Sequence, residues 1–378
     1  MNYQRSLDLI FESFIAAKPF IAGKLDRDVR DPNLLLNIAR AQNLVPAAHK
    51  VIKITGSKGK GTVARLTAHA LCKDHRVGLI TSPEEISHLD RLRINGQPIS
   101  EAEFVKCFEI VWQMTSDLRA NLFPPAYLSP YGLFLLIAFV WFKSHNVEAF
   151  VIETGRGVKF DEGGQIPAKV GVVTSVFKEH ASYLGPSLEE IRSDKHSIAD
   201  NCKHLILGKK KDRLGDKPSW YLECQITAQR CVEAFLGRTI DLPNTDCASF
   251  GHKVDEQGRQ WFYEGLIAKE SCDVGFLQRL VDEHDGEVLF LISLPDDKDI
   301  EGVCSIIHEI GGCSRHIIMT GDRGFLSYET ARQKNVIYEG PYDAPSDFSM
   351  GLDVEGAKVV YFLGTQTYLR LIKQAFFS

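Results

Sequence analysis

Short apolar runs alternate with amphipathic segments along most of the chain, and this alternation predicts its architecture. A short apolar run bounded by polar or turn residues is typical of a buried strand, whereas a spacing of three to four residues between apolar positions is typical of a helix. Strands that alternate with helices favour parallel βαβ units. The predicted strands are 51–55, 77–81, 149–153, 170–175, 204–207, 260–262, 288–292, 316–320 and 359–364, and the predicted helices are 63–71, 131–143, 188–199, 274–283, 300–310 and 367–376.

A stretch rich in Pro, Asn, Ser and Gly, 242–251, separates two such series and indicates a linker. We therefore predict two domains, as the length of 378 residues favours. The first, 1–245, is predicted to be a P-loop-type α/β domain whose mostly parallel sheet is flanked by helices. The second, 246–378, is predicted to be a smaller Rossmann-like α/β domain. The basic triplet 209–211 indicates a solvated turn.

Composition excludes several classes of function. The net charge of −5 argues against a general nucleic-acid-binding protein. The nine cysteines form no CxxC pair, which indicates neither a zinc site nor a disulfide framework and favours a reducing compartment. The N-terminus lacks a signal-peptide pattern, and the apolar run 131–142 is shorter than the ~20 residues of a membrane helix. We expect a cytoplasmic monomer or homodimer with no nucleic-acid or membrane partner.

A glycine-rich segment, GSKGKGT, stands between the first predicted strand and the next helix. Glycines at such a junction let backbone N–H groups converge on an anion, and the helix N-terminus adds positive potential. A lysine there can reach the β- and γ-phosphates, and a hydroxyl can approach the metal. The spacing departs from the GxxxxGK[ST] form, so the segment alone leaves an ordinary strand-to-helix turn open. The candidate nucleotide-binding residues are Gly56, Ser57, Lys58, Gly59, Lys60, Gly61 and Thr62.

Five segments in order resemble the signatures of one protein family, the folylpolyglutamate synthase branch of the Mur ligase superfamily. The glycine segment resembles its G-T-N-G-K-G-S/T loop, and GLITSPEEISHLDRLRINGQPIS resembles T-S-P-H followed by E-R-I-R-V-N-G. FVIETGRGVKFD resembles E-V-G-L-G-G-R-x-D, and VVTSVFKEHASYLGPSLEEIRSDKHSIA resembles T-S-I-x-x-D-H-x-x-x-L-G-x-T-x-x-x-I-A-x-E-K. DDKDIEGV resembles an aspartate-rich stretch of the family's C-terminal domain. These segments are 56–62, 78–100, 150–161, 172–199 and 296–303.

The resemblance implies ATP-dependent amide bond formation with magnesium. A substrate carboxylate attacks the γ-phosphorus of ATP and becomes an acyl phosphate, and an amine or amino acid then displaces phosphate. The partners it implies are thus a small carboxylic acid and an amine. The catalytic residues it implies are Lys60, His180 and Lys195, and the magnesium ligands are Thr62, Ser82, Glu153, His180 and, if it is carbamylated, Lys195. An unmodified Lys195 would instead form an ion pair on a helix surface. Arg156 and Asp161 are expected to order the wall of the site.

Several family positions are changed. Glu84 replaces the histidine of T-S-P-H, and Glu85 follows it, so two carboxylates would meet the incoming acid. Lys58 replaces the loop asparagine, Glu179 replaces the aspartate before His180, and Ser129–Pro130 replaces F-E. The family's adenine asparagine, its P-G-R turn and its D-x-A-H-N-P motif are missing or replaced. If the chain is a ligase, other residues must serve for adenine and for the incoming amine, and the candidates are His252, Glu264 and Lys269. Of these, we expect His252 and Glu264 to contribute to nucleotide binding.

Four functions remain open on the sequence alone. The preferred hypothesis is an ATP-dependent acid–amino acid ligase that uses an acid other than folate, because the substrate-side motifs are among those changed. A degenerate ligase that acts as a nucleotide-binding or regulatory module is one alternative. A phosphotransferase is another, and a true folylpolyglutamate synthase is the last.

Overall fold

The computed structural model describes residues 1–208, 217–242, 249–266, 268–296, 298–320 and 325–377. The chain divides into two compact units, 1–210 with 223–245 and 211–222 with 246–378. The division after residue 245 lies within the predicted linker, whereas the sequence does not predict that 211–222 joins the second unit. The centre of that linker and the basic triplet 209–211 lie outside the described residues.

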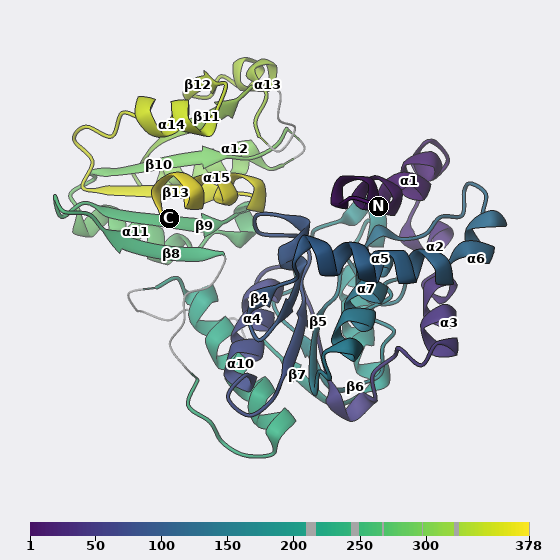
Figure 1. Cartoon of the computed structure of the whole chain (residues 1–378). Helices are drawn as coiled ribbons and strands as arrows, with labels where there is room; N and C mark the ends of the chain where they lie inside the picture. The colour runs from purple at the N-terminus through teal and green to yellow at the C-terminus, as the bar shows by residue number, and fades with distance from the viewer. Residues whose placement is uncertain (209–216, 243–248, 267, 297, 321–324, 378) are drawn as a thin grey trace. The chain divides into compact units, whose positions relative to one another are not determined.

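The first unit is built on a seven-stranded sheet with the order β4-β3-β2-β5-β1-β6-β7 (Figure 1). Strands β2, β5, β1, β6 and β7 are parallel, while β3 and β4 are antiparallel. In a parallel sheet the carboxyl ends of the strands meet at one edge, where ligands bind. The strands are β1 (Val51–Thr55), β2 (Val77–Ile80), β3 (Leu92–Ile94), β4 (Gln97–Pro98), β5 (Ala149–Glu153), β6 (Ala168–Val173) and β7 (Cys202–Leu207).

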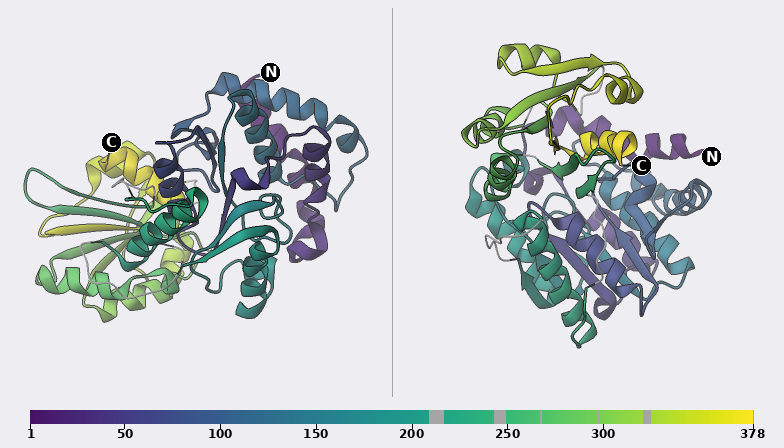
Figure 2. Two further views of the ribbon diagram at one scale, coloured as in Figure 1. Left: turned by 90° about the horizontal axis from the view of Figure 1, so that it is seen from below. Right: turned by 90° about the vertical axis from the view of Figure 1, so that its left-hand side faces the viewer.

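Helices cover both faces of this sheet. Helices α1, α3, α5 and α7 share one apolar core with the side chains of Val51, Phe150 and Ile152. Helix α4 packs on β1, β2 and β5, and it lies with α10 on the other face (Figures 1 and 2). The helices are α1 (Tyr3–Ile21), α2 (Asp26–Val29), α3 (Asn33–Ala41), α4 (Lys60–Leu71), α5 (Glu101–Met114), α6 (Ser116–Ala120), α7 (Pro130–Ser144), α8 (Ala181–Leu184), α9 (Leu188–His196) and α10 (Ser219–Leu236), in which the unit boundary falls.

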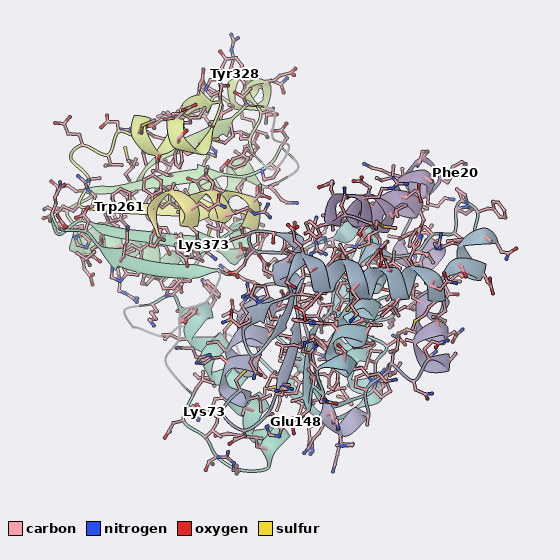
Figure 3. The ribbon with its side chains drawn as sticks, viewed as in Figure 1. Phe20, Lys73, Glu148, Trp261, Tyr328 and Lys373 are labelled. Carbon is pink, nitrogen blue, oxygen red and sulfur yellow. The ribbon has the colours of Figure 1, made fainter. Side chains whose placement is uncertain are left out.

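The second unit has a six-stranded sheet with the order β12-β11-β10-β13-β9-β8, parallel except for β8. Its two faces carry separate apolar cores, one with α11 and α12 and one with α14 and α15. Trp261, labelled in Figure 3, stacks on Phe362 and Phe376 in the latter. The elements are β8 (Phe250–Val254), β9 (Gln260–Gly265), α11 (Val274–Glu283), β10 (Val288–Ser293), α12 (Ile300–Glu309), β11 (Cys313–Met319), α13 (Tyr328–Gln333), β12 (Tyr338–Tyr342), α14 (Pro345–Gly351), β13 (Val359–Gly364) and α15 (Gln366–Phe376).

The predicted fold class, two α/β units with mostly parallel sheets flanked by helices, is confirmed. One boundary near the site is wrong: α4 begins at Lys60, not at Val63. The Lys60–Thr62 segment therefore forms the first turn of the helix, where the backbone N–H groups lack partners within the helix. Among the described helices, none is both long and apolar enough to span a bilayer.

Candidate active site

The glycine loop joins β1 to α4 at the carboxyl edge of the first sheet. Gly56 has φ +138°, and a Cβ there would lie 1.9 Å from the Thr174 hydroxyl oxygen. Gly59 has φ +88°, and a Cβ there would lie 2.5 Å from the Cys224 sulfur. Both positions therefore require glycine. No side chain caps the N-terminus of α4, whose first-turn N–H groups and dipole suit an anion.

The segment after β6 holds the loop in this conformation. The backbone N–H of Ser57 donates to the Ser175 carbonyl at 2.6 Å, and that of Lys58 donates to the Ser175 hydroxyl at 3.1 Å. The Ser57 hydroxyl donates to the Phe177 carbonyl and accepts from the Phe177 N–H. These bonds from the chain itself fix the shape of the loop. Such preorganisation is what an electrostatic binding site needs.

Lys60 lies back on the loop. Its Nζ donates to the carbonyl oxygens of Gly56 at 2.9 Å and Ser57 at 3.3 Å. The positive charge of Lys60 favours a lower pKa at four nearby groups, Glu153, Glu179, His180 and Lys195. At Glu153 the effect of burial is larger and has the opposite sign. Lys60 therefore lies among the other residues predicted for the site.

Glu153 ends β5 and is buried beside the first turn of α4. Its Oε2 accepts a hydrogen bond from the Ser82 N–H at 3.0 Å and would lie 3.3 Å from a Cβ at Gly61. Burial raises the pKa of Glu153 to about 7, although Lys60 and the Ser82 N–H oppose this rise. The nearby positive charge and hydrogen bond offset the cost of burying this carboxylate only in part. A divalent cation bound to it would offset the remainder.

The described residues contain no group of three or more His, Cys, Asp or Glu side chains placed to hold a metal ion. Magnesium does not require one, because it binds through one or two carboxylates together with water and substrate phosphates. Glu153, with Ser82 bonded to it and the buried Thr62 nearby on α4, fits such a site. These residues stay candidate ligands.

Lys195 ties three segments of the site together. This fully buried residue of α9 donates from Nζ to the Gly56 carbonyl at 2.8 Å, the Arg156 carbonyl at 3.1 Å and Glu179 Oε1 at 3.0 Å. Burial and the repulsion of Lys60 lower its pKa to about 8, against the attraction of Glu179. The ion pair with Glu179 is thus buried, whereas the alternative that the sequence left for an unmodified Lys195 was an ion pair on a helix surface. The carbamylated form stays a prediction, and its negative charge would face Glu179 and two carbonyl oxygens here.

His180 lies next to this ion pair. It has φ +51° and precedes α8, and its Nε2 lies 3.8 Å from Glu179 Oε2. Burial lowers its pKa below the usual value, more than Glu179 raises it. The side chain is still 38% exposed, which limits the size of this shift. A neutral, partly exposed imidazole is suited to act as a metal ligand.

Buried carboxylates shape the loop that follows Glu153. Asp161 accepts from the N–H groups of Gly155, Gly163 and Gly164. Asp194 accepts from those of Val158 and Lys159. The expected ordering role of Asp161 agrees with these contacts.

Other residues of the site were not predicted. Buried Arg30 pairs with Glu162 at 3.0 Å, Asp26 at 3.6 Å and Asp161 at 3.7 Å. Asp26 and Arg30 lie one helical turn apart, but many surface pairs share that spacing, so the sequence offers no specific signal for them. Sequence reasoning also missed Glu179 as the partner of Lys195.

Glu84 and Glu85 do not present two uncompensated carboxylates. Glu84 accepts hydrogen bonds from Arg91 and lies 3.3 Å from His88. Although burial would raise the pKa of Glu84, these two partners hold it well below its usual value. Glu85 pairs with Arg65 at 3.1 Å and Arg93 at 3.2 Å. The negative charge that these two residues were expected to present to an incoming acid is therefore largely cancelled by arginines.

His252 and Glu264 belong to the second unit. The buried Glu264 carboxylate accepts from Trp220 Nε1 at 2.7 Å and from the Tyr361 hydroxyl at 2.6 Å. The exposed ring of His252 stacks on Phe262 with 4.2 Å between ring centroids. These contacts give Glu264 a role inside its own unit, and nucleotide binding by either residue stays a prediction.

Comparison with solved structures first defines the class of fold. The chain aligns over its full length with the full length of a folylpolyglutamate synthase in complex with AMPPCP, with a TM-score of 0.75 at 16% identity. It also aligns over 91% of its length with 95% of the Mycobacterium tuberculosis folylpolyglutamate synthase complexed with ADP and AMPPCP, with a TM-score of 0.70 at 16% identity. The chain thus has the fold of folylpolyglutamate synthases.

Comparison with curated proteins gives the relatives by sequence. The chain is 30% identical over 171 residues to the Escherichia coli dihydrofolate synthase/folylpolyglutamate synthase, which covers 45% of this chain and 38% of that protein. It is 38% identical over 160 residues to a Saccharomyces cerevisiae folylpolyglutamate synthase, which covers 39% of this chain and 29% of that protein. The chain thus spans well under half the length of these relatives. No family model matches. The predicted resemblance to the folylpolyglutamate synthase branch of the Mur ligases is confirmed.

Proposed function

We propose that the chain is an ATP-dependent ligase that joins a carboxylic acid to an amino acid through an acyl phosphate. The observation that carries this proposal is the buried carboxyl of Glu153 beside a preformed phosphate loop and the Lys60 ammonium. Because the pKa of Glu153 is about 7, its carboxyl can release a proton near neutral pH when a divalent cation binds in its place. The similarity to ligases in both comparisons supports the same class of reaction.

In this proposal, a carboxylate oxygen of the acid bonds to the γ-phosphorus and ADP leaves. The amine nitrogen then attacks the acyl carbon, loses a proton, and phosphate leaves. Magnesium, when bound, neutralises charge on the phosphates. Lys60 moves from the carbonyls of Gly56 and Ser57 to the transferred phosphate, and Lys195 keeps the loop in place through the Gly56 carbonyl.

We further propose that the acid is a folate or pteroate and that the amino acid is glutamate. The relatives are named for this reaction, which favours it over the specialised acid expected from the sequence. That expectation rested partly on Glu84 and Glu85, which arginines compensate. A different acid remains the second candidate because the family motifs of the second unit are replaced.

The test measures ADP formation from magnesium-ATP with dihydropteroate or tetrahydrofolate and glutamate, and with each component omitted. We expect ADP formation to require all components and the folate product to gain one glutamate by mass. ADP without any amine would indicate a phosphotransferase. ATP binding with no turnover across a broad panel of acids and amines would indicate a binding module. ADP formation only with another acid would refute the folate assignment but retain the ligase.

A further inference from the structure

The side chain of Arg156, in the loop that follows Glu153, contacts two other segments. Its Nη2 donates to Asp26 Oδ1 at 2.9 Å on α2, and its Cζ lies 3.9 Å from the centre of the Tyr183 ring on α8. Its own carbonyl accepts the hydrogen bond from Lys195. One residue thereby connects the loop, α2, α8 and the buried lysine.

The acidic end of this connection is firmly anchored. Asp26 is 3% exposed and also pairs with Arg30, which is itself held by Glu162 and Asp161. Arg156 is 27% exposed, so its bond to Asp26 is largely sheltered from water. A hydrogen bond between charged groups that is sheltered from water stabilises a fold far more than an exposed ion pair does.

Helix α8, at the Tyr183 end of this connection, depends on contacts with the rest of the unit. Helix α8 has only four residues, too few to be stable by itself. Its backbone bonds run from Tyr183 and Leu184 back to the His180 carbonyl, so the placement of His180 depends on where α8 lies. Helix α8 packs on α2 and α9, and the Arg156 guanidinium over the Tyr183 ring adds a side-chain link from α8 to Asp26 of α2.

We propose that Arg156 is a positioning residue. With Asp26 and Tyr183 it forms a clamp that fixes α8, and through α8 it holds the Glu179–His180 turn beside the phosphate loop. The catalytic consequence rests on the proposed function: the clamp sets where His180 meets magnesium bound to the nucleotide. Arg156 itself contacts no reacting atom.

The direct test is hydrogen exchange of the backbone amides of residues 181–185 in the whole, ligand-free protein. Arg156→Met keeps the length of the side chain but removes the ion pair and the cation–π contact, and we expect exchange there to become about tenfold faster, the equivalent of ~1.4 kcal/mol. Arg156→Lys keeps the charge but not the planar guanidinium, so its exchange rate should lie between those of the wild type and Arg156→Met. Tyr183→Leu should accelerate the same amides and add little to Arg156→Met, because both break one clamp.

The matched control is Arg27→Ala. Arg27 also joins α2 to a neighbouring segment, through Glu190 at 3.4 Å, but the two side chains are 52% and 36% exposed. We expect no change in exchange at 181–185. Unchanged exchange in Arg156→Met, or equal acceleration in Arg27→Ala, would overturn the proposal.

The catalytic consequence has its own measurement. In Arg156→Met, the magnesium concentration for half-maximal ADP formation should rise several-fold, while KM for ATP at saturating magnesium changes less than about twofold. A uniform loss of rate that tracks the fraction of unfolded protein would overturn this part. If the wild-type protein forms no ADP with any substrate, the proposed function fails, and the exchange experiment still decides whether the clamp exists.

Discussion

At the residue scale, the chemistry of the site follows from the sequence better than its contacts do. Gly56, Lys60 and Glu153 could be proposed because each follows or ends a short apolar run, where a parallel sheet places ligands. Arg30 and Glu179 could not, because the ion pairs of Arg30 with Glu162 and of Glu179 with Lys195 join distant positions and leave no periodic signal in the chain. Their partners become visible only when the fold brings them together.

Lys60→Ala should abolish magnesium-dependent ADP formation, with a loss of at least about 100-fold, because the transferred phosphate loses its nearest cation. The variant loses the hydrogen bonds from Lys60 to the carbonyls of Gly56 and Ser57. It should still fold, because Ser175 and Phe177 also hold the loop. Circular dichroism and a steady-state ADP assay check both expectations. Activity near that of the wild type would exclude the phosphate role.

Glu153→Gln should stabilise the ligand-free protein at pH 8 and have little effect at pH 5. The pKa of Glu153 is raised to about 7 from an ordinary value of 4.5. The folded state therefore favours the protonated form, and the stability that this form provides is present below pH 4.5 and is lost as the pH rises through 7. The expected gain is about 3 kcal/mol at pH 8. Urea unfolding at both pH values measures it.

The same carboxyl links proton release to metal binding. In the wild type, magnesium-ATP should bind more tightly as the pH rises from 5 to 7, because a proton competes with the cation at Glu153. Titration calorimetry in two buffers of different ionisation enthalpy would detect the released proton. In Glu153→Gln this part of the pH dependence should disappear. A wild-type affinity that does not change over this range would contradict the assignment.

At the element scale, the pattern of apolar runs predicted the parallel strands of both units except β12. It also placed the start of α4 three residues late. The reason is local: Lys60, Gly61 and Thr62 include a glycine and a β-branched residue, which have low helix propensity. The fold overrides this preference because Thr62 is buried at 1% exposure and the loop is held by Ser175 and Phe177. The helix start is therefore a tertiary feature.

Gly59→Ala tests how tightly α10 supports the loop. The added Cβ meets both a left-handed backbone and the Cys224 sulfur at 2.5 Å, so we expect a loss of about 2 kcal/mol in stability and weaker nucleotide binding. Gly237→Ala is the matched control, because Gly237 has φ +74° and an added Cβ would have no atom within 4 Å, so that only the backbone strain applies. Adding Cys224→Ala to Gly59→Ala should restore part of the lost nucleotide binding, whereas adding it to Gly237→Ala should have no such effect. An equal loss of stability in the two glycine variants would show that the sulfur contact is unimportant.

At the scale of the whole molecule, the two units have separate cores, so their responses to nucleotide can be separated. The phosphate loop, Glu153 and Lys195 all belong to the first unit, whereas the sequence comparison predicts that the P-G-R and D-x-A-H-N-P motifs are replaced in the second. Magnesium-ATP should therefore protect the first unit more strongly than the second. At 100 times Kd the first unit should gain about 2.7 kcal/mol.

Hydrogen exchange in increasing urea measures this difference within one sample. Core amides of α7 report the first unit and those of β10 report the second, because both segments are buried in their own cores. We expect magnesium-ATP to raise the urea midpoint of the α7 amides and to leave that of the β10 amides nearly unchanged, while Lys60→Ala should remove the shift. An equal rise in both units would mean that the second unit binds the nucleotide as firmly as the first. In that case, side chains such as His252, and not the replaced family motifs, would have to supply the contacts.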